Sequence, residues 1–196
     1  VRTGSGWRER MVGLGDDGGL RFFAGAASLD SALLPPDAAR AAEGAIFEVA
    51  PARTGLMQVI AERVAEHGGA GLFIDYGYLE PGVGDTLQAL RRHAHEDVLE
   101  SPGEADITAH VDFSALGHAA RASGLDAHFS TQGAFLLAMG LLERAGRLGA
   151  AAGAAEREKI SDAVERLAGP EAMGDLFKVM AVLPGGIAVA PFPARN

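Results

Sequence analysis

The chain has 196 residues, of which 48% are hydrophobic, so its composition is that of one ordinary globular domain with a sizeable core. A net charge of −9 excludes a broad electrostatic affinity for nucleic acid or for an anionic membrane, and no basic patch offsets it. The absence of cysteine excludes disulfides, thiolate catalysis and cysteine-based zinc or iron–sulfur sites.

The amino-terminal part is predicted to begin with a β-hairpin. Residues 7–14 and 20–24 are β-prone and flank a turn-rich pentapeptide at 15–19. Residues 44–49 predict a further short strand, and Pro51 then opens a helix at a position where its missing N–H costs nothing. Helical spacing gives this helix one apolar face, made of Leu56, Val59, Ile60 and Val64.

The apolar run 72–74 is the segment around which we expect the fold to be organised. It shows no period-two alternation, which predicts a central strand buried on both faces of a sheet. Asp75, Tyr76 and Gly77 follow directly, and in open α/β sheets ligands bind outside the carboxyl ends of the strands. The alternative is that Asp75 is only a turn former or a helix cap.

The remaining elements are predicted from their periodicity and their turn residues. Residues 85–90 fit either a helix or a strand, and the acidic stretch 93–108 predicts a long surface loop. Asp112 or Ser114 is expected to cap a helix that closes at Ser123 and Gly124. The later predictions are a strand at 125–129, a helix capped by Thr131, an amphipathic helix at 156–167 and a buried strand at 176–183. Between them, residues 146–155 predict either a loosely packed helical connection or a mobile loop.

Polar side chains from two segments are predicted to meet at one acidic pocket rim if the long loop folds back over the sheet. These side chains are Asp75, Tyr76, Asp85 and Thr86 after the central strand, with His110 and Asp112 at the entrance of the next helix. Such a rim would attract a cationic group, because paired carboxylates hold a guanidinium through parallel hydrogen bonds. The alternative is that Asp112 and Thr131 are simple N-caps and that Asp106 is a loop residue.

Three histidines open a different possibility, a metal site. His93, His95 and His110, together with Asp97, could in principle bind zinc and support a metal-dependent hydrolase. Nothing in the sequence fixes them on a rigid scaffold, and histidines in a polar surface loop are commoner, so we expect no metal. The sequence also contains no P-loop, nucleophile elbow or Gly-x-Gly-x-x-Gly pattern.

Several blocks, in order, resemble the carboxy-terminal half of a known family between about residues 7 and 182. They read GWRERMVGL, GAIFEVAPARTGLMQVIAERVAEHGG, LFIDYGYLEPGVGDTLQALRRH, PGEADITAHVDFSALGHAARASGL, STQGAFLLAMG and MGDLFKVMAV. The family is that of class I S-adenosylmethionine-dependent methyltransferases which contains bacterial members and the mitochondrial complex I assembly factor that methylates an arginine.

The resemblance implies a Rossmann-like α/β fold of which this chain supplies only the later strands. Residues 72–74 would belong to the fifth strand, and 176–183 to the antiparallel seventh. Residues 1–196 would then form the carboxy-terminal part of a single methyltransferase domain, with a hairpin at 7–24 and a helical insertion at 131–172. Because the chain opens with Val1 rather than methionine, we expect it to be a fragment whose cofactor-binding residues all lie upstream.

The resemblance also implies a function, a protein-arginine N-methyltransferase that uses S-adenosylmethionine and acts on a respiratory-complex partner. The fragment alone would be inactive, and catalytic residues are not assigned. From residue type and position in the fold, the substrate-binding candidates are Asp75, Tyr76, Asp85, Thr86, His110 and Asp112. A non-catalytic assembly module of the same fold is the main alternative. We expect no nucleic-acid partner and no membrane insertion, a bacterial cytoplasmic or mitochondrial matrix location, and a homo-oligomer as one possible state.

Overall fold

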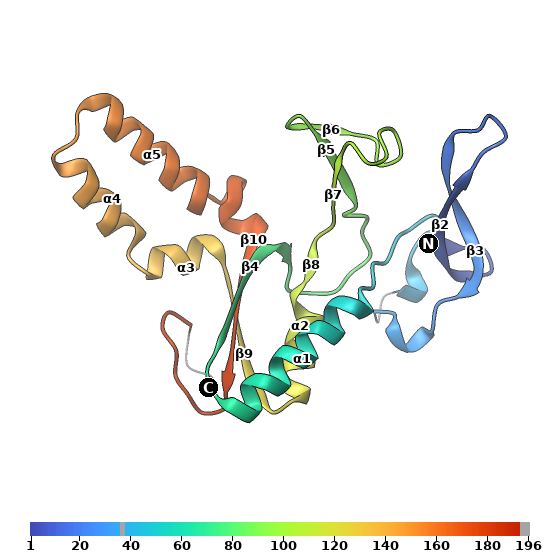
Figure 1. Ribbon diagram of the computed structural model, residues 1–196, viewed down its shortest axis with the longest axis horizontal. Helices are drawn as coiled ribbons and strands as arrows, with labels where there is room; N and C mark the ends of the chain where they lie inside the picture. Colours follow the sequence, from blue (N-terminus) through green and yellow to red (C-terminus); the bar gives the residue numbers. More distant parts are fainter. Residues whose placement is uncertain (36–37, 193–196) are drawn as a thin grey trace. The chain divides into compact units, whose positions relative to one another are not determined.

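The computed structural model describes residues 1–35 and 38–192, which divide into two compact units (Figure 1). The first unit consists of Val1–Ala50 and Pro81–His110, and the second of Pro51–Glu80 and the residues from Val111 onward. The chain therefore passes from the first unit to the second and back before it ends in the second. Within the described part of the chain, no helix is long and apolar enough to cross a bilayer.

The first sheet of the first unit has the strand order β1-β2-β3 and contains the predicted hairpin. Its strands are β1 (Arg2–Thr3), β2 (Gly6–Leu14) and β3 (Leu20–Ser28), followed by the short helical turns η1 (Ser31–Leu33) and η2 (Ala38–Arg40). Strands β2 and β3 pair antiparallel from Leu14 and Leu20 at the turn to Arg8 and Ser28 at the base. A bulge between Arg8 and Arg10 interrupts this register, and the hairpin prediction is confirmed.

The second sheet of this unit corrects two predictions. Strands β5 (Gln88–Arg91), β6 (Ala94–Glu96) and β7 (Asp106–Thr108) pair antiparallel in the order β6-β5-β7. The stretch 93–108, predicted as one long loop, therefore contributes two strands, and Asp106 is a strand residue. Arg92 and His93, both with positive φ, form the two-residue turn between β5 and β6, as tight hairpins require.

The predicted strand at 44–49 does not form. The backbone of this segment makes separate hydrogen bonds to two different parts of the chain and no strand ladder. The amide of Gly44 donates to the Arg2 carbonyl, and the Ile46 carbonyl accepts from the Gly84 amide. Phe47 instead packs edge-on against the indole of Trp7, with ring centroids 6.5 Å apart. Trp7 is buried and donates its indole N–H to the Ala38 carbonyl at 3.3 Å, so side-chain packing holds the segment in place.

The second unit is built on a mixed sheet with the strand order β8-β4-β10-β9. Strand β10 (Phe177–Pro184) pairs antiparallel with both β4 (Gly71–Tyr78) and β9 (Leu125–Thr131), which confirms the predicted antiparallel last strand. The two-residue strand β8 (Val111–Asp112) runs parallel to the end of β4. Beyond that short pairing, residues 71–76 of β4 have no ladder partner on their other side within the described part of the chain.

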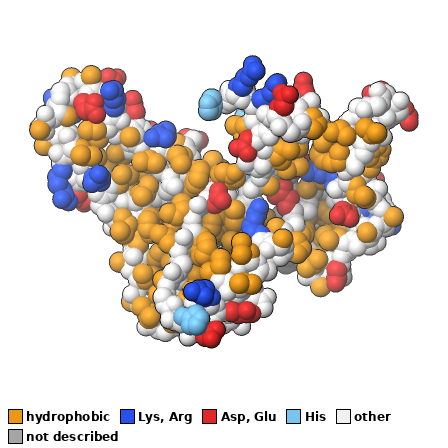
Figure 2. Space-filling model, in the orientation of Figure 1, with side chains coloured by type: hydrophobic (Ala, Val, Ile, Leu, Met, Phe, Trp, Pro, Cys, Tyr) orange, Lys and Arg blue, Asp and Glu red, His pale blue; other side chains and the backbone are white. Residues whose placement is uncertain are grey.

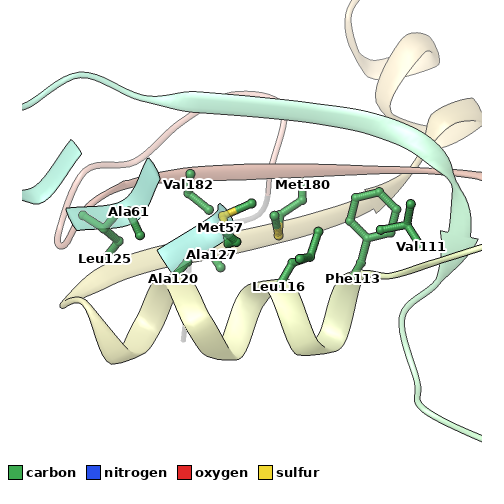
Figure 3. Close-up of a cluster of buried hydrophobic side chains, with 10 residues drawn as sticks. All are labelled: Met57, Ala61, Val111, Phe113, Leu116, Ala120, Leu125, Ala127, Met180 and Val182. Atoms are coloured by element: carbon green, nitrogen blue, oxygen red, sulfur yellow. The ribbon is translucent and has the colours of Figure 1, made fainter. Parts of the chain in front are cut away.

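One face of this sheet is covered by α1 (Pro51–His67) and α2 (Phe113–Ala122), as Figure 3 shows for the side chains between them. Phe113, Leu116 and Ala120 of α2 point toward Met180 and Val182 of β10. Members of the same cluster are Met57, Ala61, Val111, Leu125 and Ala127. On the other face of β10, Val179, Ala181 and Leu183 pack with Phe135 and Phe192.

The prediction of which face of α1 is buried is wrong. Leu56 and Val59 are exposed, whereas Met57 and Ala61 are buried against α2 and the sheet. The reason is that α1 presents the side with the smaller residue, Ala61, where α2 approaches closely. Ile60 and Val64 lie at the margin of this contact and are half-buried.

Three further helices follow β9: α3 (Gln132–Ala138), α4 (Leu141–Ala150) and α5 (Ala154–Ala168), before the short helical segment η3 (Pro170–Gly174). Helix α5 matches the amphipathic prediction for 156–167. Residues 146–155, predicted as a helical connection or a mobile loop, belong mostly to the helices α4 and α5, so the helical alternative is confirmed. Alanine is the strongest helix former, and it outweighs the glycines of this stretch.

Candidate substrate-binding site

Asp75 and Tyr76 lie inside strand β4, which continues to Tyr78 rather than ending before them. Asp75 is exposed, and its Oδ1 accepts a hydrogen bond from the Tyr76 amide at 2.9 Å. The Tyr76 ring packs edge-on against Phe177 of β10, with centroids 5.6 Å apart. Because successive strand residues point to opposite faces, the carboxylate and the phenol lie on different sides of the sheet.

Gly77 explains how β8 reaches β4. A side chain at this position would bring its Cβ to 2.2 Å from the Val111 carbonyl oxygen and to 3.0 Å from the Phe113 ring. Only glycine therefore permits the parallel pairing of Gly77 with Val111 and of Tyr78 with Asp112. This close approach places Asp112 on the strand beside the one that carries Asp75 and Tyr76.

Asp112 is the N-cap of α2, and its Oδ1 accepts from the Ala115 amide at 2.9 Å. Thr131 caps α3 in the same way, at 3.3 Å from the Ala134 amide. The predicted capping is thus confirmed for both residues. The cap uses Oδ1 of Asp112. A substrate-directed role of this residue is a separate prediction.

Asp85 is held by an arginine that the sequence reasoning missed. The Arg10 guanidinium binds both carboxylate oxygens, at 2.6 Å and 3.0 Å, and stacks 4.4 Å above the Phe22 ring. This hydrogen-bonded guanidinium lowers the pKa of Asp85, and the partial burial of the carboxyl opposes the effect. Arg10 and Asp85 are 75 positions apart in the chain, so no local pattern predicts that they pair. The alternation of bulky and charged residues along 7–11 is the one signal, and it cannot identify Asp85.

Thr86 is fixed by a second missed residue, Glu48. The Glu48 carboxylate accepts from the Thr86 amide at 2.9 Å and from the Thr86 hydroxyl at 2.5 Å. The same hydroxyl accepts from the His110 amide at 2.9 Å. Thr86 therefore ties residues 48 and 110 together, and its hydroxyl is fully engaged within the first unit.

The six candidates fall into two groups of three. Asp75, Tyr76 and Asp112 lie on the neighbouring strands β4 and β8 of the second unit. The first unit contains the other three, Asp85, Thr86 and His110, of which Thr86 contacts the His110 backbone directly. The prediction that all six share one rim stays a prediction.

Metal binding gains no support. Within residues 1–35 and 38–192, no group of three histidine, aspartate or glutamate side chains is arranged to hold a metal ion. His93 belongs to a tight turn, and His95 lies next to it on β6. The hydrolase interpretation based on these histidines therefore has no geometric basis among the described residues.

Among the described residues, no strand leads through a glycine turn into a helix. That the cofactor-binding residues lie upstream stays a prediction. A nucleotide-type site needs a glycine turn that leads from a strand straight into a helix. After β4 the chain instead runs through residues 79–87 without a helix, and the Gly84 amide in that stretch donates to the Ile46 carbonyl. Strand β9 does lead directly into a helix, but Thr131 rather than a glycine turn makes that junction.

Comparison with known proteins gives the family. Residues 1–131 match the model of a family described as "putative S-adenosyl-L-methionine-dependent methyltransferase". The zebrafish (Danio rerio) mitochondrial protein arginine methyltransferase NDUFAF7 is 35% identical over 186 residues, which cover 93% of this chain and 43% of the relative. The mouse (Mus musculus) protein of the same name is 34% identical and aligns with 93% of this chain and 42% of its own length.

Solved structures agree with the sequence matches. A "likely methyl transferase" from Burkholderia thailandensis, bound to S-adenosyl-homocysteine, superposes with a TM-score of 0.77 at 27% identity and covers 98% of this chain. That alignment spans 52% of the Burkholderia chain, and a second structure from the same organism gives a TM-score of 0.81 at 29% identity. The fold is thus the predicted Rossmann-like class I fold. The chain spans about half the length of the relatives that it matches. The chain belongs to this family of S-adenosyl-L-methionine-dependent methyltransferases.

Proposed function

We propose that the protein containing this chain transfers methyl groups from S-adenosylmethionine to arginine side chains of a partner protein. The observation that carries the proposal is the 35% identity to a protein arginine methyltransferase over 93% of the chain. The structural similarity to a protein bound to S-adenosyl-homocysteine, the demethylated form of the cofactor, supports the same chemistry. The relatives are mitochondrial proteins, and we propose the mitochondrial matrix or the bacterial cytoplasm as the location.

The proposed reaction asks the protein mainly to position its substrates. Methyl transfer is an in-line displacement at the carbon bound to a sulfonium, and it is accelerated by holding the attacking nitrogen close and aligned. A carboxylate that accepts from two guanidinium N–H groups fixes the plane of the arginine and keeps the third nitrogen free for attack. We assign this role to the carboxylates of the candidate set rather than to a metal.

The geometry ranks those carboxylates. Asp75 is exposed, and Asp112 lies on the adjacent strand, paired with Tyr78. Tyr78 follows Asp75 by three residues, so strand alternation turns the two carboxylates to opposite faces, and each would hold a guanidinium on its own face. Asp85 already binds Arg10 through both oxygens and would have to exchange partners to hold a substrate guanidinium. We therefore propose Asp75 and Asp112 as the principal acceptor ligands and keep Tyr76, Asp85, Thr86 and His110 as secondary candidates.

The test uses the longer protein and separates charge from structure. Asparagine caps a helix as well as aspartate does, so Asp112→Asn keeps α2 intact and removes only the charge. Together with Asp75→Asn it should lower arginine methylation, measured by mass spectrometry of modified protein, while calorimetric titration shows unchanged cofactor affinity. Asp162→Asn, on the exposed surface of α5, serves as the matched control.

Two results would overturn the proposal. If the longer protein binds no S-adenosylmethionine in a calorimetric titration, it acts as the non-catalytic assembly module instead. If it binds the cofactor but the Asp75→Asn and Asp112→Asn variants, alone and combined, methylate arginine like the wild type, the acceptor site lies elsewhere in the protein.

A further inference from the structure

The β2–β3 hairpin carries an apolar surface that stays exposed although the Arg10 guanidinium stacks on its Phe22 ring. On one side of the ribbon Val12, Leu14, Leu20 and Phe22 are neighbours in the antiparallel register and are all exposed. The opposite side exposes Met11 and Phe23. Hydrophobic side chains accordingly gather on this part of the surface in Figure 2. Strand β1 pairs only with Gly6 and Trp7, so the rest of the ribbon is two-stranded. An isolated two-stranded ribbon is only marginally stable, which favours a further contact.

Strand β3 also offers a free edge. It is the last strand of the β1-β2-β3 sheet, so one side of its backbone has no strand partner among the described residues. Its sequence contains no proline and only one charged residue, Arg21. Natural edge strands are normally protected by charges, prolines or bulges. Here the bulge opposite Arg8 and Arg10 protects only the base of the hairpin and leaves 20–24 regular.

We propose that β3 pairs with β3 of a second copy of this chain, antiparallel and across a two-fold axis at Phe22, the centre of the regular run. Two copies of one strand can pair across such an axis only in the antiparallel sense. In this register Leu20 lies opposite the partner's Ala24, and Arg21 lies opposite the partner's Phe23. The two three-stranded sheets become one six-stranded sheet, and like charges do not face each other across the axis.

Charge complementarity supports a second copy as the occupant. The same register sets Ala26 opposite the partner's Gly18, at the tip of the partner's hairpin. The Arg8 guanidinium is located there, because it donates to the Ala26 carbonyl at 2.5 Å. The tip carries two exposed carboxylates: Asp17 is bound by Arg21 of the same hairpin at 2.7 Å, and Asp16 is the one that faces the partner's Arg8 in this register. In the dimer the Arg8 guanidinium of each copy therefore lies near the acidic turn of the other copy. The two-fold axis makes this contact occur twice.

The first experiment uses the absence of cysteine from this chain. A single cysteine at the axis, Phe22→Cys, should form an intermolecular disulfide under mild oxidation. Ala24→Cys in the same strand lies opposite the partner's Leu20 and should cross-link much less, and Ala150→Cys on α4 gives the background. Cross-linking of the Phe22 variant at the level of Ala150→Cys would overturn the proposal.

The second experiment needs no change at the apolar surface. Sedimentation velocity of the unmodified chain should show a dimer that dissociates on dilution. Arg8→Glu should raise the dimer dissociation constant about two- to tenfold, the range of two exposed ion pairs, and Arg8→Glu combined with Asp16→Arg should restore it. A chain that stays monomeric at every concentration, or a charge swap that fails to restore association, would overturn the pairing.

Discussion

Strands β4 and β10 are neighbours with similar sequences and different surroundings. Each contains an apolar run without alternation, and they pair so that Ile74 faces Val179 and Phe73 faces Met180. In β10, Val179 and Met180 are both 0% exposed. In β4, Leu72 is 55% and Ile74 46% exposed, while only Phe73 packs against the core cluster. The prediction that 72–74 is buried on both faces is therefore wrong for this chain.

The difference teaches that an apolar run determines a tendency to be buried, whereas its neighbours determine whether burial occurs. Strand β10 has a strand on each side, the helices α1 and α2 on one face, and Phe135 and Phe192 on the other. Strand β4 has the same helices on one face but only a two-residue neighbour, β8, beside its far edge. Asp75, one of the two proposed principal acceptor ligands, thus lies on the more open of the two strands.

The largest expected effect tests the comparison directly. Met180→Ala should lower the free energy of unfolding by about 2–5 kcal/mol, because it removes a fully buried side chain and leaves a cavity. Ile74→Ala, on the half-exposed face of β4, should cost about 1 kcal/mol or less. Urea denaturation of both variants measures the difference, and equal costs would show that β4 is covered in solution. A larger cost of Ile74→Ala in the longer protein would show that its additional residues cover this face.

Gly77→Ala tests the one place where β4 is enclosed. The new methyl group would meet the Val111 carbonyl, so the backbone must move, and we expect a loss of about 1–3 kcal/mol. Gly82→Ala is the matched control, because nothing lies within 4 Å of a Cβ built there. Similar midpoints for the two variants in urea would contradict the close approach of β8 to β4.

Asp112→Ala tests the helix that covers β10. Loss of the hydrogen bond to the Ala115 amide should destabilise the chain by about 1 kcal/mol, whereas Asp112→Asn keeps the cap and should cost little. Thermal unfolding followed by circular dichroism measures both. If asparagine were as damaging as alanine, the charge rather than the cap would be the stabilising feature of this residue.

The smallest effect concerns Lys178, which lies opposite Asp75 at the start of β10. Burial lowers the pKa of its ammonium below the ordinary value of 10.5, and Asp175 opposes this only in part. Between the lowered pKa and 10.5 the unfolded chain binds more protons, so stability should rise with pH across that window. Lys178→Met should remove the rise, which urea midpoints at several pH values would detect. An identical pH dependence in the variant would assign the rise to other groups.

Local patterns predicted most of the second unit. Helix α1 begins at Pro51, α2 begins after Asp112 and closes at Ser123, and β9, α5 and β10 lie where the periodicity placed them. These signals succeed because caps, glycine stops and apolar periodicity act over a few residues. The face of α1 could not be predicted, since it depends on how closely α2 packs against Ala61.

The candidate site shows the same division. The sequence singled out Asp85, Thr86 and Asp112, and the N-cap alternative for Asp112 followed from its position before a helix. Arg10 and Glu48, which bind Asp85 and Thr86, could not be found, because the partners lie 75 and 38 positions away in the chain. Pairings at such distances leave no mark on local periodicity.

By itself the sequence determined the element types, the hairpin, the family resemblance and the residues that cap the helices. These properties depend on contacts between near neighbours in the chain or on motifs read in order. Only the tertiary structure decided which apolar runs are covered, which carboxylates are already neutralised, and where β3 and β4 lack a strand partner among residues 1–35 and 38–192. The physical reason is that burial and ion pairing depend on neighbours in space. Such neighbours can be far apart along the chain, so they cannot be read from local sequence patterns.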